Sequence, residues 1–286
     1  MKVALIQTSY SQNMDEKVAN LVKKASKNAE LVVLQELHSS PYFCITEDPK
    51  NFDWADNFEE SLKFWSEVAK ENRVVLVTSL FEKRASGIYH NTAFVFEKDG
   101  SIAGKYRKMH IPDDPAFYEK FYFTEGDLGF TPIDTSVGRL GVLICWDQWY
   151  PESARLMALA GAEVLIYPTA IGWLEEEPIE EQKSQLERWI TVQRGHSIAN
   201  SIPVITPNRI GFEKDPSNNF NGITFWGNSF ILDANGEVIA RGSSDQEEIL
   251  FATLDKKITD ETRKMWPFFR DRRIASYGNL LKRYID

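Results

Sequence analysis

Residues 140–152 read LGVLICWDQWYPE and mark a point where a buried strand gives way to a helix. The apolar run Leu140–Ile144 is typical of a short buried strand. Pro151 and Glu152 are typical of the first turn of a helix. Cys145 lies between these two elements, so rigid neighbours would hold its sulfur toward a cleft. A thiol in such a place becomes a nucleophile when a base and a positive charge reach it.

The alternation of strand and helix continues along the chain. Apolar runs predict strands at residues 3–7, 31–34, 73–80, 91–96, 102–106, 140–144, 163–167, 204–206, 227–233, 237–240 and 248–254. Amphipathic runs predict helices at 15–28, 58–71, 152–160 and about 180–200. Helices between apolar strands, with hairpin signals at Lys98-Asp99-Gly100 and Asn235-Gly236, indicate an α/β fold. Two mixed sheets face to face with helices outside fit this order.

The chain has 286 residues, which is enough to bury a large core without disulfides. It contains no repeat and no stretch typical of a linker, so we expect a single domain over 1–286. The final residues 266–286 are rich in apolar side chains. We therefore expect this C-terminal extension to pack on the body or at a subunit interface.

The N-terminus enters a strand-like run at once, without the pattern of a signal peptide. The chain has two cysteines, and together these features predict a reduced, cytoplasmic protein. A net charge of −9 argues against nucleic acid and anionic membranes as partners, and it suits a small cationic substrate. The four histidines are scattered and lack the spacing of a metal site, so no metal or other cofactor is expected.

Two further reactive groups follow predicted strands in the way that Cys145 does. Glu36 follows the run 31–35, which is expected to be buried, and burial there would make its carboxylate a useful general base. Lys108 follows the strand 102–106. Three such groups, each just beyond a strand, are expected to converge at one rim of a sheet.

In these contexts Glu36, Lys108 and Cys145 resemble the Glu-Lys-Cys triad of the nitrilase superfamily, which are carbon–nitrogen hydrolases. The resemblance extends over essentially the whole chain, and it implies an α-β-β-α sandwich and an assembly built from dimers. It further implies that Glu119 is a second glutamate that holds the lysine and the substrate, and that the backbone N–H of Trp146 helps Lys108 to stabilise an oxyanion. The segments most like the branch that hydrolyses N-carbamoylputrescine are Lys108–Pro115, Tyr118–Phe123 and Cys145–Glu152.

The substrate is predicted from the residues that follow Cys145. Relatives that hydrolyse N-carbamoyl amino acids place basic residues there, whereas residues 146–152 contain none. We therefore expect Trp146, Asp147 and Gln148 to border a cationic carbamoyl amine. For Asp147, a substrate contact and a structural hydrogen bond remain open. Further acids near the cleft are Asp113, Asp114 and Glu175–Glu177, which also fit turn formers and a solvated helix start.

Three alternatives remain open at this point. The substrate could be another carbamoyl amine or an ω-amide, including N-carbamoyl-β-alanine. The chain could also be a catalytically silent binding protein of the same fold. Finally, His38 and His110 lie near the candidate residues, so a Cys-His hydrolase is the nearest mechanistic competitor. Cys44 is expected to be a packed loop thiol.

Overall fold

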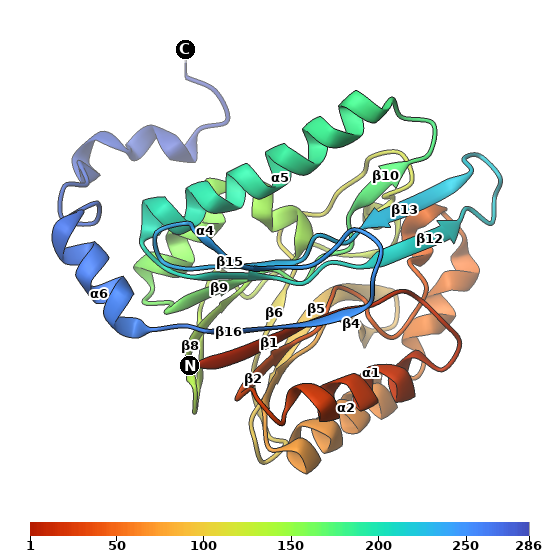
Figure 1. Ribbon diagram of the computed structural model, residues 1–286. Helices are drawn as coiled ribbons and strands as arrows, with labels where there is room; N and C mark the ends of the chain where they lie inside the picture. Colours follow the sequence, from red (N-terminus) through yellow and green to blue (C-terminus); the bar gives the residue numbers. More distant parts are fainter. Residues whose placement is uncertain (286) are drawn as a thin grey trace.

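In the computed structural model, which describes residues 1–285, two large mixed sheets lie between two layers of helices (Figure 1). The first sheet has seven strands in the order β16-β1-β2-β3-β5-β4, with β6 beside β5. Its strands are β1 (Lys2–Gln7), β2 (Leu31–Val33), β3 (Val75–Val77), β4 (Leu80–Ala85), β5 (Ile88–Phe96), β6 (Ile102–Arg107) and β16 (Glu248–Thr253).

The second sheet has six strands in the order β15-β14-β11-β9-β8-β7. Its strands are β7 (Ile133–Thr135), β8 (Gly138–Val142), β9 (Val164–Ile166), β11 (Val204–Thr206), β14 (Phe230–Leu232) and β15 (Val238–Arg241). The predicted hairpin at Asn235-Gly236 joins β14 to β15, and the chain then returns to the first sheet as β16.

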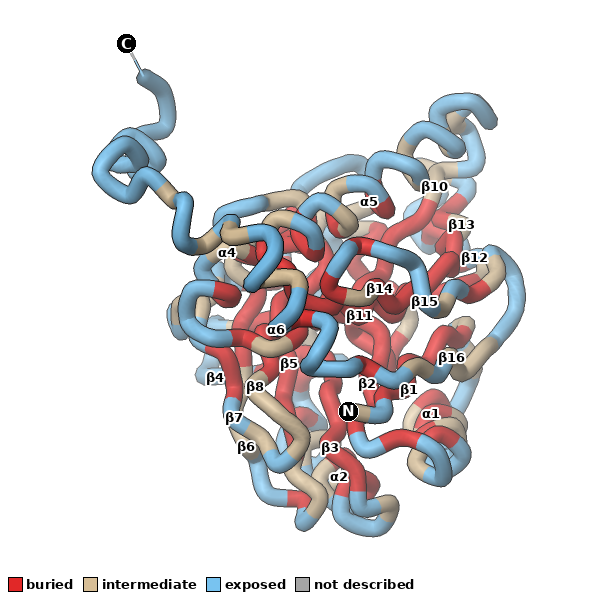
Figure 2. The backbone as a smooth tube through the Cα atoms, turned by 60° about the vertical axis from the view of Figure 1, so that its left-hand side comes forward, coloured by how far each residue is buried: buried red, intermediate tan, exposed pale blue. Residues whose placement is uncertain are grey.

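Side chains of the central strands of the first sheet alternate between two cores, as the period of two requires. In β1, Val3 and Leu5 point into the layer between the sheets, whereas Ala4 and Ile6 pack toward the helices on the outer face. The outer helices there are α1 (Met14–Ala25) and α2 (Phe58–Asn72); α4 (Pro151–Leu159) and α5 (Ile179–Asn200) cover the second sheet (Figure 1). Figure 2 shows the buried strands enclosed by partly exposed helices. The predicted sandwich is confirmed.

A third sheet was not predicted. It has three strands in the order β10-β13-β12, formed by β10 (Gly172–Leu174), β12 (Ile210–Lys214) and β13 (Gly222–Trp226). The prediction of one strand over 73–80 was also wrong, because β3 ends at Val77 and β4 begins at Leu80. Between them, Ser79 turns its hydroxyl toward the Asn91 side chain, which leads to the candidate site.

The central strands of both sheets are parallel to their neighbours, namely β1-β2-β3 in one sheet and β8-β9-β11 in the other. Glu36 follows β2 and Cys145 follows β8, so both residues lie beyond carboxyl ends of parallel strands. Such ends are where α/β sheets commonly bind ligands.

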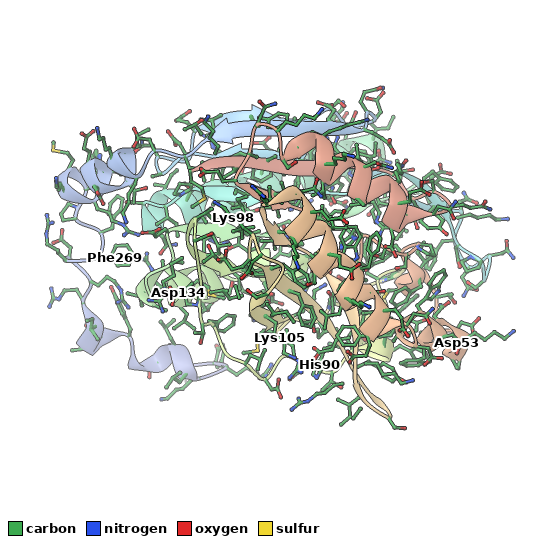
Figure 3. All side chains as sticks on the ribbon, turned by 90° about the horizontal axis from the view of Figure 1, so that it is seen from below. Asp53, His90, Lys98, Lys105, Asp134 and Phe269 are labelled. Carbon is green, nitrogen blue, oxygen red and sulfur yellow. The ribbon has the colours of Figure 1, made fainter. Side chains whose placement is uncertain are left out.

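The chain after α6 (Lys256–Met265) extends away from the two sheets (Figures 1 and 2). It contains two short 3-10 turns, η4 (Ile274–Ser276) and η5 (Gly278–Leu281), and its residue 286 lies outside the described residues. Phe269, labelled in Figure 3, is an anchor, since the guanidinium groups of Arg155 and Arg263 lie over its ring. None of the helices between residues 1 and 285 combines the length and apolar character needed to cross a membrane.

Candidate active site

Lys108 joins the two predicted glutamates. Its Nζ lies 2.7 Å from Glu36 Oε1 and 2.5 Å from Glu119 Oε2. All three side chains are shielded from solvent, with exposed fractions of 0%, 0% and 1% for Lys108, Glu36 and Glu119. Burial opposes a charged amine, but the two carboxylates together raise the pKa of Lys108 above its ordinary value. Lys108 is therefore a fixed ammonium between two acids.

Both oxygens of Glu36 are held by donors from different parts of the fold. Oε1 accepts from Asn91 Nδ2 at 2.7 Å in addition to Lys108, and Oε2 accepts from the backbone N–H of Ala170 at 2.9 Å. Asn91 lies in β5, and Ala170 follows β9 of the second sheet. The carboxylate of Glu36 is thus fixed at the junction of the two sheets.

Cys145 begins η3 (Cys145–Trp149), between β8 and α4 as the sequence predicted, although β8 ends at Val142 rather than at Ile144. Its φ of 38° lies in the left-handed region, which is uncommon for a residue with a side chain. The backbone N–H of Cys145 donates to Pro168 O at 2.9 Å, which ties this turn to the end of β9. Burial, followed by the charge of Glu36, raises the pKa of the Cys145 thiol, although Lys108 lowers it. The sulfur therefore keeps its proton until a base takes it.

Glu119 opens the short helix α3 (Glu119–Tyr122). Its Oε1 accepts from the Tyr42 hydroxyl at 2.8 Å, while Oε2 faces Lys108. Burial raises the pKa of Glu119 to about 7, although Lys108 lowers it. One ammonium between two buried carboxylates explains why one carboxyl group holds its proton more tightly.

A cavity of about 400 Å³ opens at Cys145. Its charged lining is mainly acidic, with Asp114, Glu119, Glu177 and Glu181 against one basic residue, Arg188. The larger apolar and aromatic side chains of the lining are Pro112, Pro115, Phe117, Trp146, Trp149, Ile171, Leu174 and Trp226. Asp114 and Glu177 were among the acids expected near the cleft, whereas Glu181 and Arg188 were not expected.

The structure separates the three residues expected to bind substrate. Trp146 lines the cavity, whereas Gln148 is buried outside its lining, with Nε2 4.0 Å from the Cys145 sulfur. Asp147 is not among the lining residues, and its side chain is 0% exposed. Its carboxylate accepts hydrogen bonds from Tyr106, His110 and Ile144. Of the two roles that the sequence left open for Asp147, the geometry favours the structural hydrogen bond, because donors of the fold already occupy the carboxylate.

Neither histidine near the candidate residues faces the thiol as a base would. His38 packs edge-on against Trp65, and burial lowers its pKa to about 3. His110 faces Asp147 through Nδ1 at 2.7 Å and stacks on Tyr150 with ring centroids 3.8 Å apart. Cys44 is a buried free thiol in an apolar cluster, as expected.

Sequence reasoning missed three residues that support the glutamates: Tyr42, Asn91 and Arg209. Arg209 is fully buried and donates through Nη2 to the carbonyls of Leu37 and Ser40 at 2.9 and 3.1 Å. The signal for Asn91 was a polar residue within an apolar strand. Tyr42 and Arg209 offered no comparable signal, because their partners lie far away in the sequence.

Comparison with known proteins identifies the family. Residues 2–264 match the family described as carbon-nitrogen hydrolase. The chain is 41% identical to a citrullinase of Francisella tularensis, with 99% of each chain covered. It is 40% identical to an N-carbamoylputrescine amidase of Oryza sativa, with 95% of this chain and 90% of the relative covered.

The structure matches the crystal structure of a carbon-nitrogen hydrolase from Helicobacter pylori with a TM-score of 0.98 and 58% identity. That match covers 100% of this chain and 99% of the other. With its fold, its buried thiol and these relatives, the protein belongs to the carbon-nitrogen hydrolase family and is an amidohydrolase of the nitrilase superfamily.

Proposed function

We propose that this amidohydrolase converts N-carbamoylputrescine to putrescine, carbon dioxide and ammonia. The observation that carries the proposal is the acidic cavity at Cys145, whose lining carboxylates outnumber its one basic side chain. N-carbamoylputrescine has a ureido group at one end and an ammonium at the other. A thiol beside carboxylates suits both ends, and residues 146–152 add no positive charge.

Glu177 is the best candidate for binding the distal ammonium. Its Oε1 accepts from Gln185 Nε2 at 2.7 Å and its Oε2 accepts from the backbone N–H of Leu174 at 3.1 Å. These bonds orient the carboxylate without neutralising it. By contrast, Glu181 is paired with Arg188 at 2.5 Å. An oriented, uncompensated carboxylate attracts a cation more strongly than one that already has a cationic partner.

The proposed reaction begins when Glu36 accepts the proton of Cys145 and the sulfur attacks the ureido carbonyl carbon. The bond from this carbon to the terminal nitrogen then breaks, and Glu36 gives its proton to the departing ammonia. The remaining thioester is attacked by water, again with Glu36 as the base. The carbon–sulfur bond breaks, Cys145 regains a proton, and the released carbamate decomposes to carbon dioxide and the amine.

The tetrahedral steps develop negative charge on the former carbonyl oxygen. Lys108 supplies a fixed ammonium for it, and the backbone N–H of Trp146 supplies a second donor. Trp146 is the second residue of η3, so its N–H lies in the first turn, where the helix itself offers no acceptor. Donors that are fixed before the reaction stabilise such charge most effectively. Glu119 keeps Lys108 in place.

Citrulline is a second candidate substrate, and Arg188 is the observation that favours it. Citrulline carries the same ureido group, but its other end has both an ammonium and a carboxylate. The guanidinium of Arg188 lines the same cavity and could bind that carboxylate, since arginine matches a carboxylate in geometry. The citrullinase relative, at 41% identity, agrees with this alternative as well as the amidase does with the first.

Ammonia release from four substrates tests the proposal: N-carbamoylputrescine, citrulline, N-carbamoyl-β-alanine and a simple ω-amide. We expect kcat/KM to be highest for N-carbamoylputrescine, with no turnover by Cys145→Ala. Faster turnover of citrulline would replace the proposed substrate with the second candidate. Faster turnover of N-carbamoyl-β-alanine, or turnover of none of the four substrates, would refute both candidate substrates.

Substitution of the cavity arginine separates the two candidates further. Arg188→Met should leave kcat/KM for N-carbamoylputrescine unchanged or higher, and should lower it for citrulline. Lys183→Met is the matched control, because Lys183 is an exposed cation of α5 that does not line the cavity. Equal effects of the two variants on citrulline would show that Arg188 has no role in binding it.

The compartment and partners are part of the same proposal. Cys44 and Cys145 are both free thiols, which supports a reducing compartment such as the cytoplasm. The net charge of −9 supports small cationic ligands rather than nucleic acid or anionic membranes as partners.

A further inference from the structure

Asp147 connects the turn that carries Cys145 to the segment that carries Lys108, although it lies outside the cavity. It belongs to the turn that carries Cys145, after strand β8 of the second sheet. Its side-chain partners Tyr106 and His110 flank Lys108 in the chain. Tyr106 is in β6 of the first sheet, so one carboxylate bridges the two sheets.

One oxygen of Asp147 holds the nucleophile turn. Oδ2 accepts from the backbone N–H of Ile144 at 2.9 Å, and the backbone N–H of Asp147 donates to Ile144 O at 3.0 Å. These two bonds close a loop around Cys145, whose φ of 38° needs such support. Tyr106 donates to the same oxygen at 2.9 Å, which ties the turn to the end of β6.

The other oxygen of Asp147 holds the chain just after Lys108. Oδ1 accepts from the backbone N–H of His110 at 3.0 Å, and His110 Nδ1 faces it at 2.7 Å. A carboxylate offers about four acceptor positions, and these four donors fill them. The carboxylate is fully buried, so water does not compete for these bonds.

We infer that Asp147 is a positioning residue that fixes the distance between the Lys108 ammonium and the Cys145–Trp146 turn. This inference rests on the proposed thiol chemistry of the site, and it holds for either candidate substrate. Lys108 and the Trp146 N–H come from different sheets, yet both must face the same developing oxyanion. Asp147 is bonded to both supporting segments, so its loss would let the two donors move apart.

Asp147→Asn tests this role, because the amide keeps the size of the carboxylate but presents N–H groups to donors of the fold. We expect kcat per titrated Cys145 to fall by about 100-fold, as for a misplacement of about 1 Å. KM should change by less than about threefold, since Asp147 does not touch the substrate. Ser153→Ala is the matched control: it removes a buried hydrogen bond to the Asp147 carbonyl but no link to Lys108.

A second readout does not depend on any substrate. Iodoacetamide modification of Cys145, followed by peptide mass spectrometry, should be slower in Asp147→Asn than in wild type and Ser153→Ala at neutral pH. The reason is that a displaced Lys108 no longer stabilises the thiolate. If the wild type turned over none of the four substrates, the proposed function would fail while this measurement still tested the positioning role.

The inference would be overturned if Asp147→Asn kept the wild-type kcat per titrated Cys145 and showed only a lower Tm. Asp147 would then be a purely structural residue. Should Asp147→Asn fail to fold, Tyr106→Phe removes one of the four bonds and keeps the ring packing. A smaller decrease of kcat in the same direction is expected for it. Equal kcat values for Tyr106→Phe and Ser153→Ala would then overturn the inference.

Discussion

The Cys145 thiol and the Glu119 carboxyl group share one electrostatic setting. Two buried carboxylates face one ammonium, so the cluster carries an excess of negative charge whenever both acids are ionised. Burial raises the pKa of Cys145 most, and the negative charge of Glu36 raises it further, because a thiolate would add to that charge. For the chemistry, this means that Glu36 must take the thiol proton in the same step as the sulfur attacks.

The raised pKa of Glu119 predicts a pH-dependent stability. Folding raises it from 4.5 to about 7, so the folded state binds this proton more tightly than the unfolded state. The contribution to stability is therefore full below pH 4.5 and is lost as the pH rises through about 7. The glutamine of Glu119→Gln cannot ionise, so the variant does not lose this contribution. As the pH rises from 4.5 to about 7, the Tm of the variant should therefore increase relative to the Tm of the wild type.

Differential scanning calorimetry from pH 4.5 to 8 measures this difference. Glu125→Gln, at an exposed position of the same region, is the control for losing one carboxylate. A Tm difference for Glu119→Gln that stays constant across the range would contradict the assigned titration of Glu119.

At the scale of single residues, the sequence indicated the reactive groups better than their supports. Glu36, Lys108 and Cys145 each follow a predicted strand, and this pattern together with the resemblance to the nitrilase-superfamily triad singled them out as candidates. Tyr42 and Asn91 bind the glutamates across separations of 77 and 55 residues, so no local pattern shows which residues they contact. Asp147 was ambiguous for the same reason, because only the fold brings His110 and Tyr106 to it.

Among the elements, the sequence did not reveal the third sheet, nor strand β7 and helix α6. Strand β12 of the third sheet has the buried pattern of neither a core strand nor a simple alternation, since Phe212 is 49% exposed and Glu213 is buried. Strand β12 is held in place by pairing with β13 and by the Arg209–Glu213 ion pair. Long-range pairing of this kind overrides local propensity.

The Arg209–Glu213 pair clamps the loop after β2 that carries Glu36. Arg209 donates to carbonyls of this loop, and Glu213 Oε2 accepts from the backbone N–H of Tyr42 at 2.6 Å. Arg209→Met would leave Glu213 buried without its partner and remove donors from the loop. We expect the free energy of unfolding to fall by about 3–5 kcal/mol, the usual cost of breaking a buried pair.

Urea denaturation measures this loss, with Arg84→Met as the matched control. Arg84 pairs with Asp127 on the surface, where both side chains are more than 40% exposed. Such exposed pairs contribute about 0–1 kcal/mol. A loss in Arg209→Met no greater than in Arg84→Met would show that the clamp does not stabilise the loop.

At the scale of the whole molecule, the segment after α6 lies away from the two sheets (Figure 1) and keeps many apolar side chains exposed. Trp266, Ile274 and Leu281 are 61%, 71% and 95% exposed, although side chains of this kind are normally buried. Exposed leucine and isoleucine also occur on α4 and α5, at Leu156, Leu159 and Ile198. Several exposed apolar side chains within one segment are typical of an interface with another protein.

We expect residues 266–285 to bind a second copy of the chain, as the sequence predicted for this extension. Leu281→Asp places a charge at the most exposed of these apolar side chains and should shift the protein toward a smaller species in light scattering. Asn279→Asp adds the same charge at a polar position of η5 and should leave the mass unchanged. Because Phe269 anchors the start of the segment through Arg155 and Arg263, the folded body should survive either change. An equal mass for Leu281→Asp and wild type, or a monomeric wild type, would exclude this segment as the subunit interface.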